Sequence, residues 1–224
     1  MAATDLTTYN LITSEEQLRQ ILSPPHAVVA DKTIDHIDDH CRSFIERSPF
    51  VLIATSDGRG HFDVSPKGDP AGFVQILDAN TLAIPERPGN HRADTFTNVL
   101  QHPHVGLIFL VPGVKTTLRV AGRASITDDL ELRESMALEL GGRQRSGGPS
   151  VPDLALLVHV EEAMLHCAKC IIRSNLWGSE AEQLAANAAG VSGLAEAMAD
   201  HTSTDWPAEK MRRVIERDEQ DNLY

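Results

Sequence analysis

The residues of this chain best suited to bind an anion lie within the segment 63–98. The hydroxyl of Ser65 and the ammonium group of Lys67 come near the end of an expected strand, and Gly68 follows them. A strand end of this kind lets a phosphate approach both side chains and backbone N–H groups. Arg92 adds a guanidinium group that can hold a phosphate through two hydrogen bonds.

A second element suited to anions is a helix expected to begin at Asn90, with Arg92 in its first turn. The free N–H groups and the dipole of a helix start favour negative charge. The strand end and the helix start are one hairpin apart, so both could close on a single phosphate. The spacing alone is equally compatible with plain turns at Ser65-Pro66 and Pro88-Gly89 whose charges are solvated.

The elements expected to position these residues are short strands joined by tight turns. Strands are expected at residues 50–55, 61–65, 72–77, 81–85, 104–111, 116–126 and 153–160. Short strands joined this closely indicate an antiparallel barrel or sandwich rather than a parallel sheet. The predicted fold class is therefore a β-barrel with flanking helices, an α+β arrangement.

Helices are expected on both sides of these strands. Apolar residues at helical spacing predict a helix over 33–47, and a capping box at Ser14 predicts a short one before it. Further helices are expected at 128–140, from residue 161 to about 172, and over 180–219 with a break near 202–207. We expect an N-terminal arm (1–30), one barrel domain (31–180) and a helical extension of that domain (181–224).

The composition excludes several classes of protein. The formal net charge is −12, so a general nucleic-acid or anionic-membrane binding surface is excluded, and any phosphate must bind in a local basic pocket. No apolar run approaches the roughly 18 residues that span a bilayer, and the N-terminus lacks the pattern of a secretory signal. The three cysteines are too few for a disulfide framework, so a cytoplasmic location is expected.

An ordered set of short motifs runs from about residue 35 to residue 180. They are Ala54-Thr55, Val64-Ser-Pro-Lys-Gly-Asp69, Gly72-Phe73, Ile84-Pro85, Arg87-Pro-Gly-Asn90, Arg92, Asn98, Phe109, Pro112-Gly113, Thr117-Leu-Arg-Val120, Gly122-Arg-Ala124, His166-Cys167 and Arg173-Ser-Asn-Leu-Trp177. In this order they resemble the FMN-binding split-barrel family related to pyridoxamine 5'-phosphate oxidase, and within it a bacterial subgroup without a settled activity.

The resemblance implies a mostly antiparallel split barrel that forms a homodimer, with FMN at the interface. It implies that the strand of Ser65 and Lys67 contacts the phosphate and ribityl chain, and that the Ile84–Pro85 backbone lies beside the isoalloxazine ring. The helix start at Asn90 would complete the phosphate site. The implied cofactor-binding residues are Ser65, Lys67, Gly68, Ile84, Pro85, Asn90, Arg92, Asn98, Arg119, Arg173, Ser174 and Trp177.

Part of this set, together with His166, is expected to come from the second subunit as a distal wall of the flavin site. The residues concerned are Arg119, His166, Arg173, Ser174 and Trp177. On a continuous helix, His166, Arg173 and Trp177 would share one face, because steps of seven and four residues return to the same side. The alternative is that Arg173 pairs with a local carboxylate such as Glu162 and that Trp177 belongs to the core.

The function implied by the resemblance is an FMN-dependent oxidoreductase that passes a hydride or electrons through flavin N5 to or from a small organic molecule. NADH and NADPH are candidate electron donors, and His166 and Arg173 are the candidates to polarise a substrate. The alternatives are a non-catalytic flavin carrier or sensor, or a split barrel that binds haem or a deazaflavin. The Trp- and Arg-containing segment with which the oxidase binds pyridoxamine phosphate has no match in residues 178–224, so a genuine pyridoxamine 5'-phosphate oxidase is not expected.

Two other clusters invite a metal or redox interpretation. His36 and His40 are four residues apart, but no third ligand is evident, so a solvated helical face is preferred. The sequence Cys167-Ala-Lys-Cys170 would need a strand before a helix start to act as a dithiol, yet Cys167 is expected inside a helix. We therefore expect no metal site, and we expect the cysteines to be small buried residues.

Overall fold

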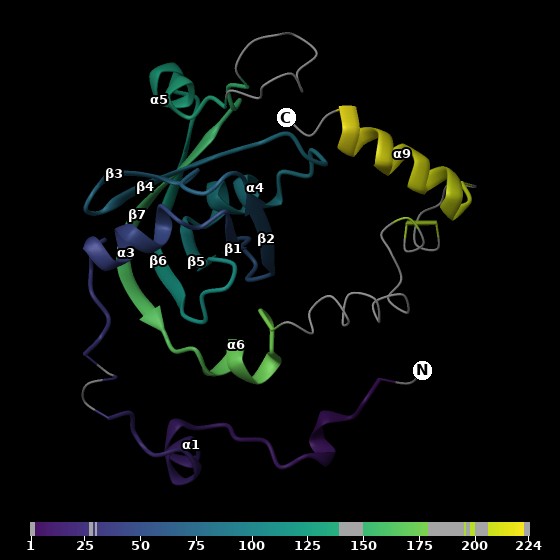
Figure 1. Ribbon diagram of the computed structural model, residues 1–224. Coiled ribbons are helices and arrows are strands. Elements are labelled where there is room, and N and C mark those ends of the chain that lie inside the picture. Colours follow the sequence, from purple (N-terminus) through teal and green to yellow (C-terminus); the bar gives the residue numbers. More distant parts are fainter. Residues whose placement is uncertain are drawn as a thin grey trace. The chain divides into compact units, whose positions relative to one another are not determined.

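The computed structural model of the protein describes residues 3–26, 29, 31–138, 150–178, 195, 198–199 and 206–221 (Figure 1). The chain divides into two compact units, Met1–Thr33 and Ile34–Tyr224. The first unit contains a 3-10 helix, η1 (Leu6–Thr8), and a helix, α1 (Glu15–Ile21). The side chain of Ser14 accepts a hydrogen bond from the backbone of Gln17, so the predicted helix cap is confirmed.

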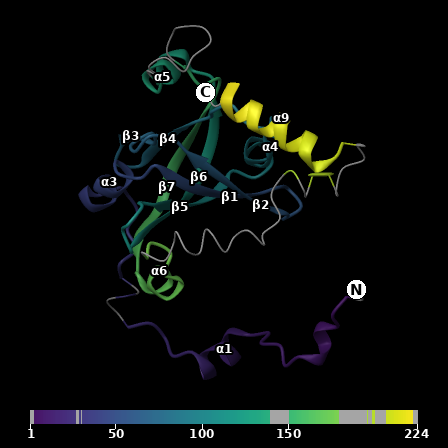
Figure 2. The same ribbon diagram turned by 45° about the vertical axis from the view of Figure 1, so that its right-hand side comes forward.

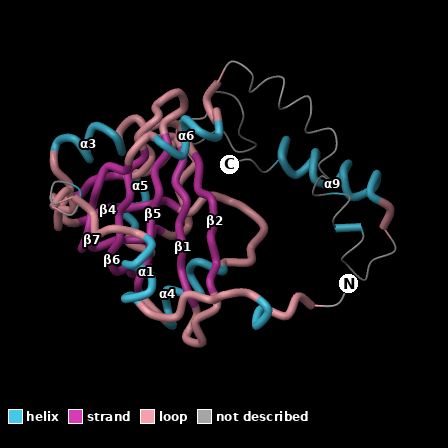
Figure 3. Tube along the Cα trace, turned by 90° about the horizontal axis from the view of Figure 1, so that it is seen from below, coloured by secondary structure: helices cyan, strands magenta, loops and turns pink. Residues whose placement is uncertain are grey.

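The second unit contains one sheet of seven strands, and every neighbouring pair is antiparallel. The strands are β1 (Phe50–Ser56), β2 (Phe62–Gly68), β3 (Gln75–Asp78), β4 (Thr81–Pro85), β5 (His104–Leu110), β6 (Thr117–Thr127) and β7 (Ala155–His166). Their order across the sheet is β2-β1-β5-β6-β7-β4-β3. Figure 3 shows β2 as the outermost strand beside β1. The predicted antiparallel barrel with flanking helices is confirmed.

Five helices are described in this unit: α3 (Asp39–Ile45), α4 (Asp94–Gln101), α5 (Leu130–Ser135), α6 (Lys169–Ser174) and α9 (Ala208–Asp221). One face of the sheet and the helices α3 and α4 share a single cluster of buried apolar side chains. Ile53, Leu107 and Val158 in this cluster are completely buried. α4 packs against β1, β2 and β6, close to the site described below (Figures 1 and 2).

The long strands β6 and β7 change register between Ala121 and Gly122. A Cβ atom on Gly122 would lie 2.0 Å from the carbonyl oxygen of His159, so only glycine fits where the two backbones approach. Bulges of this kind bend a strand and increase its twist, which a sheet needs in order to curl into a barrel.

Three predicted helices differ from the structure. The helix expected over 33–47 begins only at Asp39, because Asp38 caps it and Ile34 instead pairs with the backbone of Ala163. The helix expected at 128–140 is limited to α5. The helix expected from residue 161 to about 172 is wrong, because β7 continues to His166 along β6. For the helix expected over 180–219 with a break near 202–207, most of the part before the break lies outside the described residues, and the part after the break is α9.

Candidate functional site

A cavity of about 530 Å³ lies beside the C-terminal half of β2. Its wall is formed by residues 65–68 of β2, residues 85–91 and 93 after and at the end of β4, Phe73, Phe96 of α4, and residues 151–154 before β7. Cavities of roughly 300–1,000 Å³ are typical of small-molecule and cofactor sites.

Two ion pairs cross the gap between β2 and β4, which are not neighbours in the sheet. Lys67 Nζ on β2 lies 2.5 Å from Glu86 Oε2, directly after β4. Arg87 Nε lies 2.7 Å from Asp69 Oδ2, which follows β2. Charged side chains rather than backbone hydrogen bonds therefore join the two strands at this place, and the cavity opens beside them.

Arg87 is the most highly connected side chain of the site. Its other two nitrogens donate hydrogen bonds to the carbonyl oxygens of Met136, at 2.8 Å, and Ser150, at 3.3 Å. The side chain of its partner Asp69 is fully buried, and Asp69 Oδ1 has no hydrogen-bond partner among the described residues. Arg87 thus fixes three separate segments of chain around the cavity.

The remaining cavity wall combines polar groups with apolar surfaces. Lys67 lies 5.7 Å from the centre of the Phe96 ring, and the Ser65 hydroxyl donates to Asp63 at 2.7 Å. Pro85 and Phe96 supply apolar surface. The wall thus combines a cation, a hydroxyl and apolar surface with the carboxylates of Glu86 and Asp153, which suits a ligand that has both a polar and an apolar part.

Five of the sequence-predicted cofactor residues come together in this wall: Ser65, Lys67, Gly68, Pro85 and Asn90. Ile84 is buried in the core beside it. The side chain of Arg92 is exposed and lies outside the wall, 2.8 Å from Asp94, and this hydrogen bond raises the pKa of Arg92. The sequence missed Glu86 as the partner of Lys67, because Lys67 lies on β2 and Glu86 directly follows β4, and these two strands are separated in the sheet.

The predicted helix start at Asn90 is wrong. His91 and Ala93 have left-handed backbone conformations, with φ of 57° and 54°, so the chain cannot turn into a helix before Asp94. Ala93 occupies the capping position and makes no side-chain hydrogen bond. Asn90 therefore lines the cavity from a loop, with its side chain accepting a hydrogen bond from the backbone of Arg92 at 3.0 Å.

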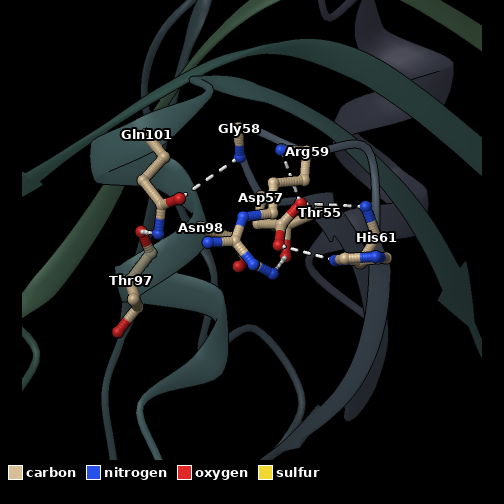
Figure 4. A network of polar contacts seen from close by, with 8 residues as sticks. All are labelled: Thr55, Asp57, Gly58, Arg59, His61, Thr97, Asn98 and Gln101. Carbon is tan, nitrogen blue, oxygen red and sulfur yellow. Dashed lines mark hydrogen bonds and ion pairs between the residues drawn. The ribbon is translucent and has the colours of Figure 1, made fainter.

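Asn98 belongs to a polar network that ties α4 to β1 and to the turn after it (Figure 4). Its side-chain amide donates to the hydroxyl of Thr55 at 3.0 Å. One turn later on α4, the side chain of Gln101 accepts a hydrogen bond from the backbone of Gly58 at 3.3 Å. Asn98 is outside the cavity wall, and these contacts position α4, which carries Phe96.

The turn between β1 and β2 is closed by the carboxylate of Asp57 (Figure 4). The backbone N–H groups of Arg59 and His61 donate to Asp57 Oδ1 at 2.8 and 2.9 Å. His61 Nδ1 also lies 2.9 Å from Asp57 Oδ2. Hydrogen bonds from the backbone and the side chain of His61 lower the pKa of Asp57 to about 2.

None of the residues expected to form a distal wall lines the cavity of its own chain: Arg119, His166, Arg173, Ser174 and Trp177. The predicted shared helical face is wrong, because His166 ends β7, Arg173 lies in α6, and the helix stops before Asn175, whose φ is 51°. Trp177 Nε1 donates to the carbonyl oxygen of Val114 at 3.0 Å.

Two further properties concern only the described part of the chain. None of its helices combines the length and the apolar character needed to cross a membrane. Nor do three or more of its His, Cys, Asp and Glu side chains form a group that could hold a metal ion.

A family model described as pyridoxamine 5'-phosphate oxidase matches residues 37–167, which include all seven strands and the whole cavity wall. No curated protein matches the sequence. Among solved structures, HupZ of Group A Streptococcus is 20% identical with a TM-score of 0.44, over 57% of this chain and 91% of HupZ. A NimC/NimA family protein of Clostridium acetobutylicum is 22% identical with a TM-score of 0.41, over 57% and 85%. An FMN-binding protein of Syntrophomonas wolfei is 12% identical with a TM-score of 0.39, over 56% and 88%.

Proposed function

Because the chain belongs to the pyridoxamine 5'-phosphate oxidase family, we propose that it binds FMN in the cavity between β2 and β4. We further propose that it is an FMN-dependent oxidoreductase acting on a small organic molecule. The observation that carries the proposal is the position of Lys67, a cation in the wall of a cofactor-sized cavity within the segment that matches the family.

In this proposal Lys67 and Ser65 hold the phosphate end of the cofactor, and Pro85 and Phe96 line its ring system. The acidic chain supplies the positive charge locally, as a net charge of −12 requires. The carboxylate of Glu86 holds the Lys67 side chain in place. In the complex, the ammonium group of Lys67 would bind both this carboxylate and the phosphate. Bound FMN supplies hydride or electron transfer, while the protein binds it, orients it and shapes the space for the substrate.

The proposed assembly is a homodimer. In one chain, His166 is the last residue of β7, residues 167–177 follow it, and Arg119 pairs with Met164 near the same end. Leu154 in the cavity wall instead precedes the start of β7. Arg119, His166, Arg173, Ser174 and Trp177 therefore serve as the distal wall of the flavin site of a second copy. His166 and Arg173 remain the candidates that polarise a substrate, with NADH or NADPH as the candidate electron donor.

The test begins with the absorbance spectrum of the purified protein and mass spectrometry of the cofactor released by heat. The proposal expects flavin bands, FMN rather than FAD, and bleaching of those bands by NADH or NADPH without oxygen. If the flavin stays oxidised with every donor, the proposed oxidoreductase activity is rejected, and a flavin carrier or sensor is the function that fits. A Soret band, a deazaflavin, or no flavin after reconstitution with FMN overturns the proposed cofactor.

A further inference from the structure

The sequence Cys167-Ala-Lys-Cys170 lies at the junction between β7 and α6. β7 ends at His166, Cys167 follows it directly, and Ala168 precedes the first residue of α6, Lys169. Figure 1 shows α6 as the next element after the arrow of β7, with a stretch of coil between them. The expectation that both cysteines are buried is wrong, because Cys167 and Cys170 are exposed.

The backbone brings the two cysteines close together. Ala168 is in the right-handed helical region, with φ −71° and ψ −7°, and Lys169 is the first helical residue. Two successive residues in this conformation form a turn in which the Cα atoms of the first and fourth residues are less than about 7 Å apart. Disulfides join Cα atoms about 4.4–6.8 Å apart, so this turn brings the backbones of Cys167 and Cys170 close to the range in which a disulfide forms.

The third cysteine, Cys41, differs from the other two in its exposure to solvent. Cys41 is buried in α3, and burial together with a hydrogen bond to Asp38 raises its pKa to about 12. The thiolate is the reactive form of cysteine, so Cys41 is protected by both its position and its protonation. Cys167 and Cys170 are accessible to solvent, and His166, Lys169 and Arg173 are basic residues within three positions of one of them.

We propose that Cys167 and Cys170 are a redox-active dithiol that forms a reversible disulfide by exchange with a low-molecular-weight disulfide. The thiolate of one cysteine attacks the small disulfide, which forms a mixed disulfide and releases one small thiolate. The second cysteine then attacks the protein sulfur of the mixed disulfide and releases the other small thiolate. The two protons of the cysteines leave with the two small thiols, so the protein is oxidised by two electrons and the small disulfide is reduced.

The two cysteines lie outside the cavity wall of their own chain, and the inference does not depend on flavin binding. α6 has only six residues, and isolated helices of this length are marginal in water. A covalent link between Cys167 and Cys170 would fix its first turn. The oxidation state of the pair would thus set how firmly the segment that carries Arg173 is held.

The experiment exposes the reduced protein to glutathione disulfide and counts its free thiols before and after. Remaining thiols are alkylated, and the protein is then digested with trypsin, which cuts after Lys169 between the two cysteines. The proposal expects the loss of both accessible thiols and a disulfide that joins the peptide Cys170–Arg173 to the peptide ending at Lys169. In Cys167→Ser and in Cys170→Ser, we expect the loss of one thiol and the binding of one glutathione. In Cys41→Ser, we expect the same linked peptides as in the wild type.

Three outcomes overturn the proposal: no loss of thiols, stable glutathione on a cysteine of the wild type without linked peptides, or a disulfide between two chains on a non-reducing gel. Hydrogen exchange of α6 gives an independent reading. Its amides exchange more slowly in the oxidised wild type than in the reduced one, and equal rates contradict the proposed link. The double variant Cys167→Ser/Cys170→Ser is the control in which glutathione disulfide leaves the exchange unchanged.

Discussion

In this acidic protein, the side chain of Lys67 is preorganised to bind an anion. Its ammonium group lies near the Phe96 ring and is held by Glu86 across the gap between β2 and β4. The side chain is only 20% exposed, so its direction is fixed before a ligand arrives. A fixed cation in a cavity wall loses little conformational entropy on binding.

Lys67→Ala is expected to weaken FMN binding without unfolding the protein. The loss of one charged hydrogen bond costs roughly 1.5–3 kcal/mol, which is about 10- to 150-fold in affinity. Quenching of flavin fluorescence measures the dissociation constant. Lys210→Ala removes the same charge from α9, outside the cavity wall, and should bind FMN like the wild type. Wild-type affinity of Lys67→Ala would contradict the phosphate assignment.

Arg87 and Asp69 predict a second residue-scale effect, on stability. Arg87→Ala leaves the fully buried carboxylate of Asp69 without its partner, and breaking a buried pair from one side costs about 3–5 kcal/mol. Urea unfolding measures the change in free energy. Arg213→Ala breaks the exposed pair with Glu209 and should cost about 0–1 kcal/mol. Equal effects of the two variants would show that Arg87 has no structural role at the cavity.

At the scale of the element, the turn between β1 and β2 is predicted to depend on pH. Asp57 has its pKa lowered to about 2 from an ordinary value of 3.8. A lowered pKa contributes stability that is fully present above pH 3.8 and is lost as the pH falls through about 2. The melting temperature of the wild type should therefore exceed that of Asp57→Ala at pH 5, and the difference should shrink towards pH 2. A difference that is constant over this range would contradict the role of the carboxylate.

The strands were predictable from the sequence where apolar alternation and turn residues agree. The predicted strand at 81–85 has the bounds of β4, because Asp78-Ala-Asn80 marks the turn before it. β7 was predicted only as far as residue 160, because Glu161 and Glu162 interrupt its alternation at the bulge with β6. There the pairing with a neighbouring strand overrides the local pattern.

The site was predictable only in part, because the sequence shows local patterns but not the contacts between distant segments. Ser65 and Lys67 could be found because they stand at the end of a strand with glycine behind them. The ion pairs of Lys67 with Glu86 and of Arg87 with Asp69 join segments about 20 residues apart, and only the curl of the sheet brings them together. The left-handed residues His91 and Ala93, neither of them glycine, carry no sequence signal, so the helix start was misplaced.

At the scale of the whole molecule, the outer face of β2, β1 and β5 carries apolar side chains that are exposed among the residues that the structure describes. Val64 pairs with Ala54 and Leu52 pairs with Ile108, so these side chains lie on the face opposite the core. Phe62 is 80%, Val64 58% and Ile108 40% exposed. An apolar patch on an edge strand and its neighbours is typical of a protein interface.

We expect this face to form the proposed homodimer, so light scattering should report about twice the chain mass of 24.4 kDa. Val64→Asp places a charge at the centre of the face and should give a monomer at micromolar concentration, because an unpaired charge is costly to bury. Val214→Asp is the matched control: it changes an exposed valine of α9 and should leave the dimer intact. A dimeric Val64→Asp would place the interface elsewhere.

The dimer matters for function if the wall of each flavin site comes from the other subunit, and a mixed dimer tests this. One subunit carries Lys67→Ala in its cavity, and the other carries Arg173→Ala in the segment after β7. If Arg173 acts across the interface, both changes fall in one site, and the second site keeps an intact cavity and an intact wall. Flavin titration then shows half the sites with wild-type affinity and the other half strongly weakened. If each chain builds its site alone, every site carries one change, and two weakened sites in the mixed dimer would refute the shared wall. The two parent homodimers, in which every site carries one change under either arrangement, give the reference affinities for each single loss.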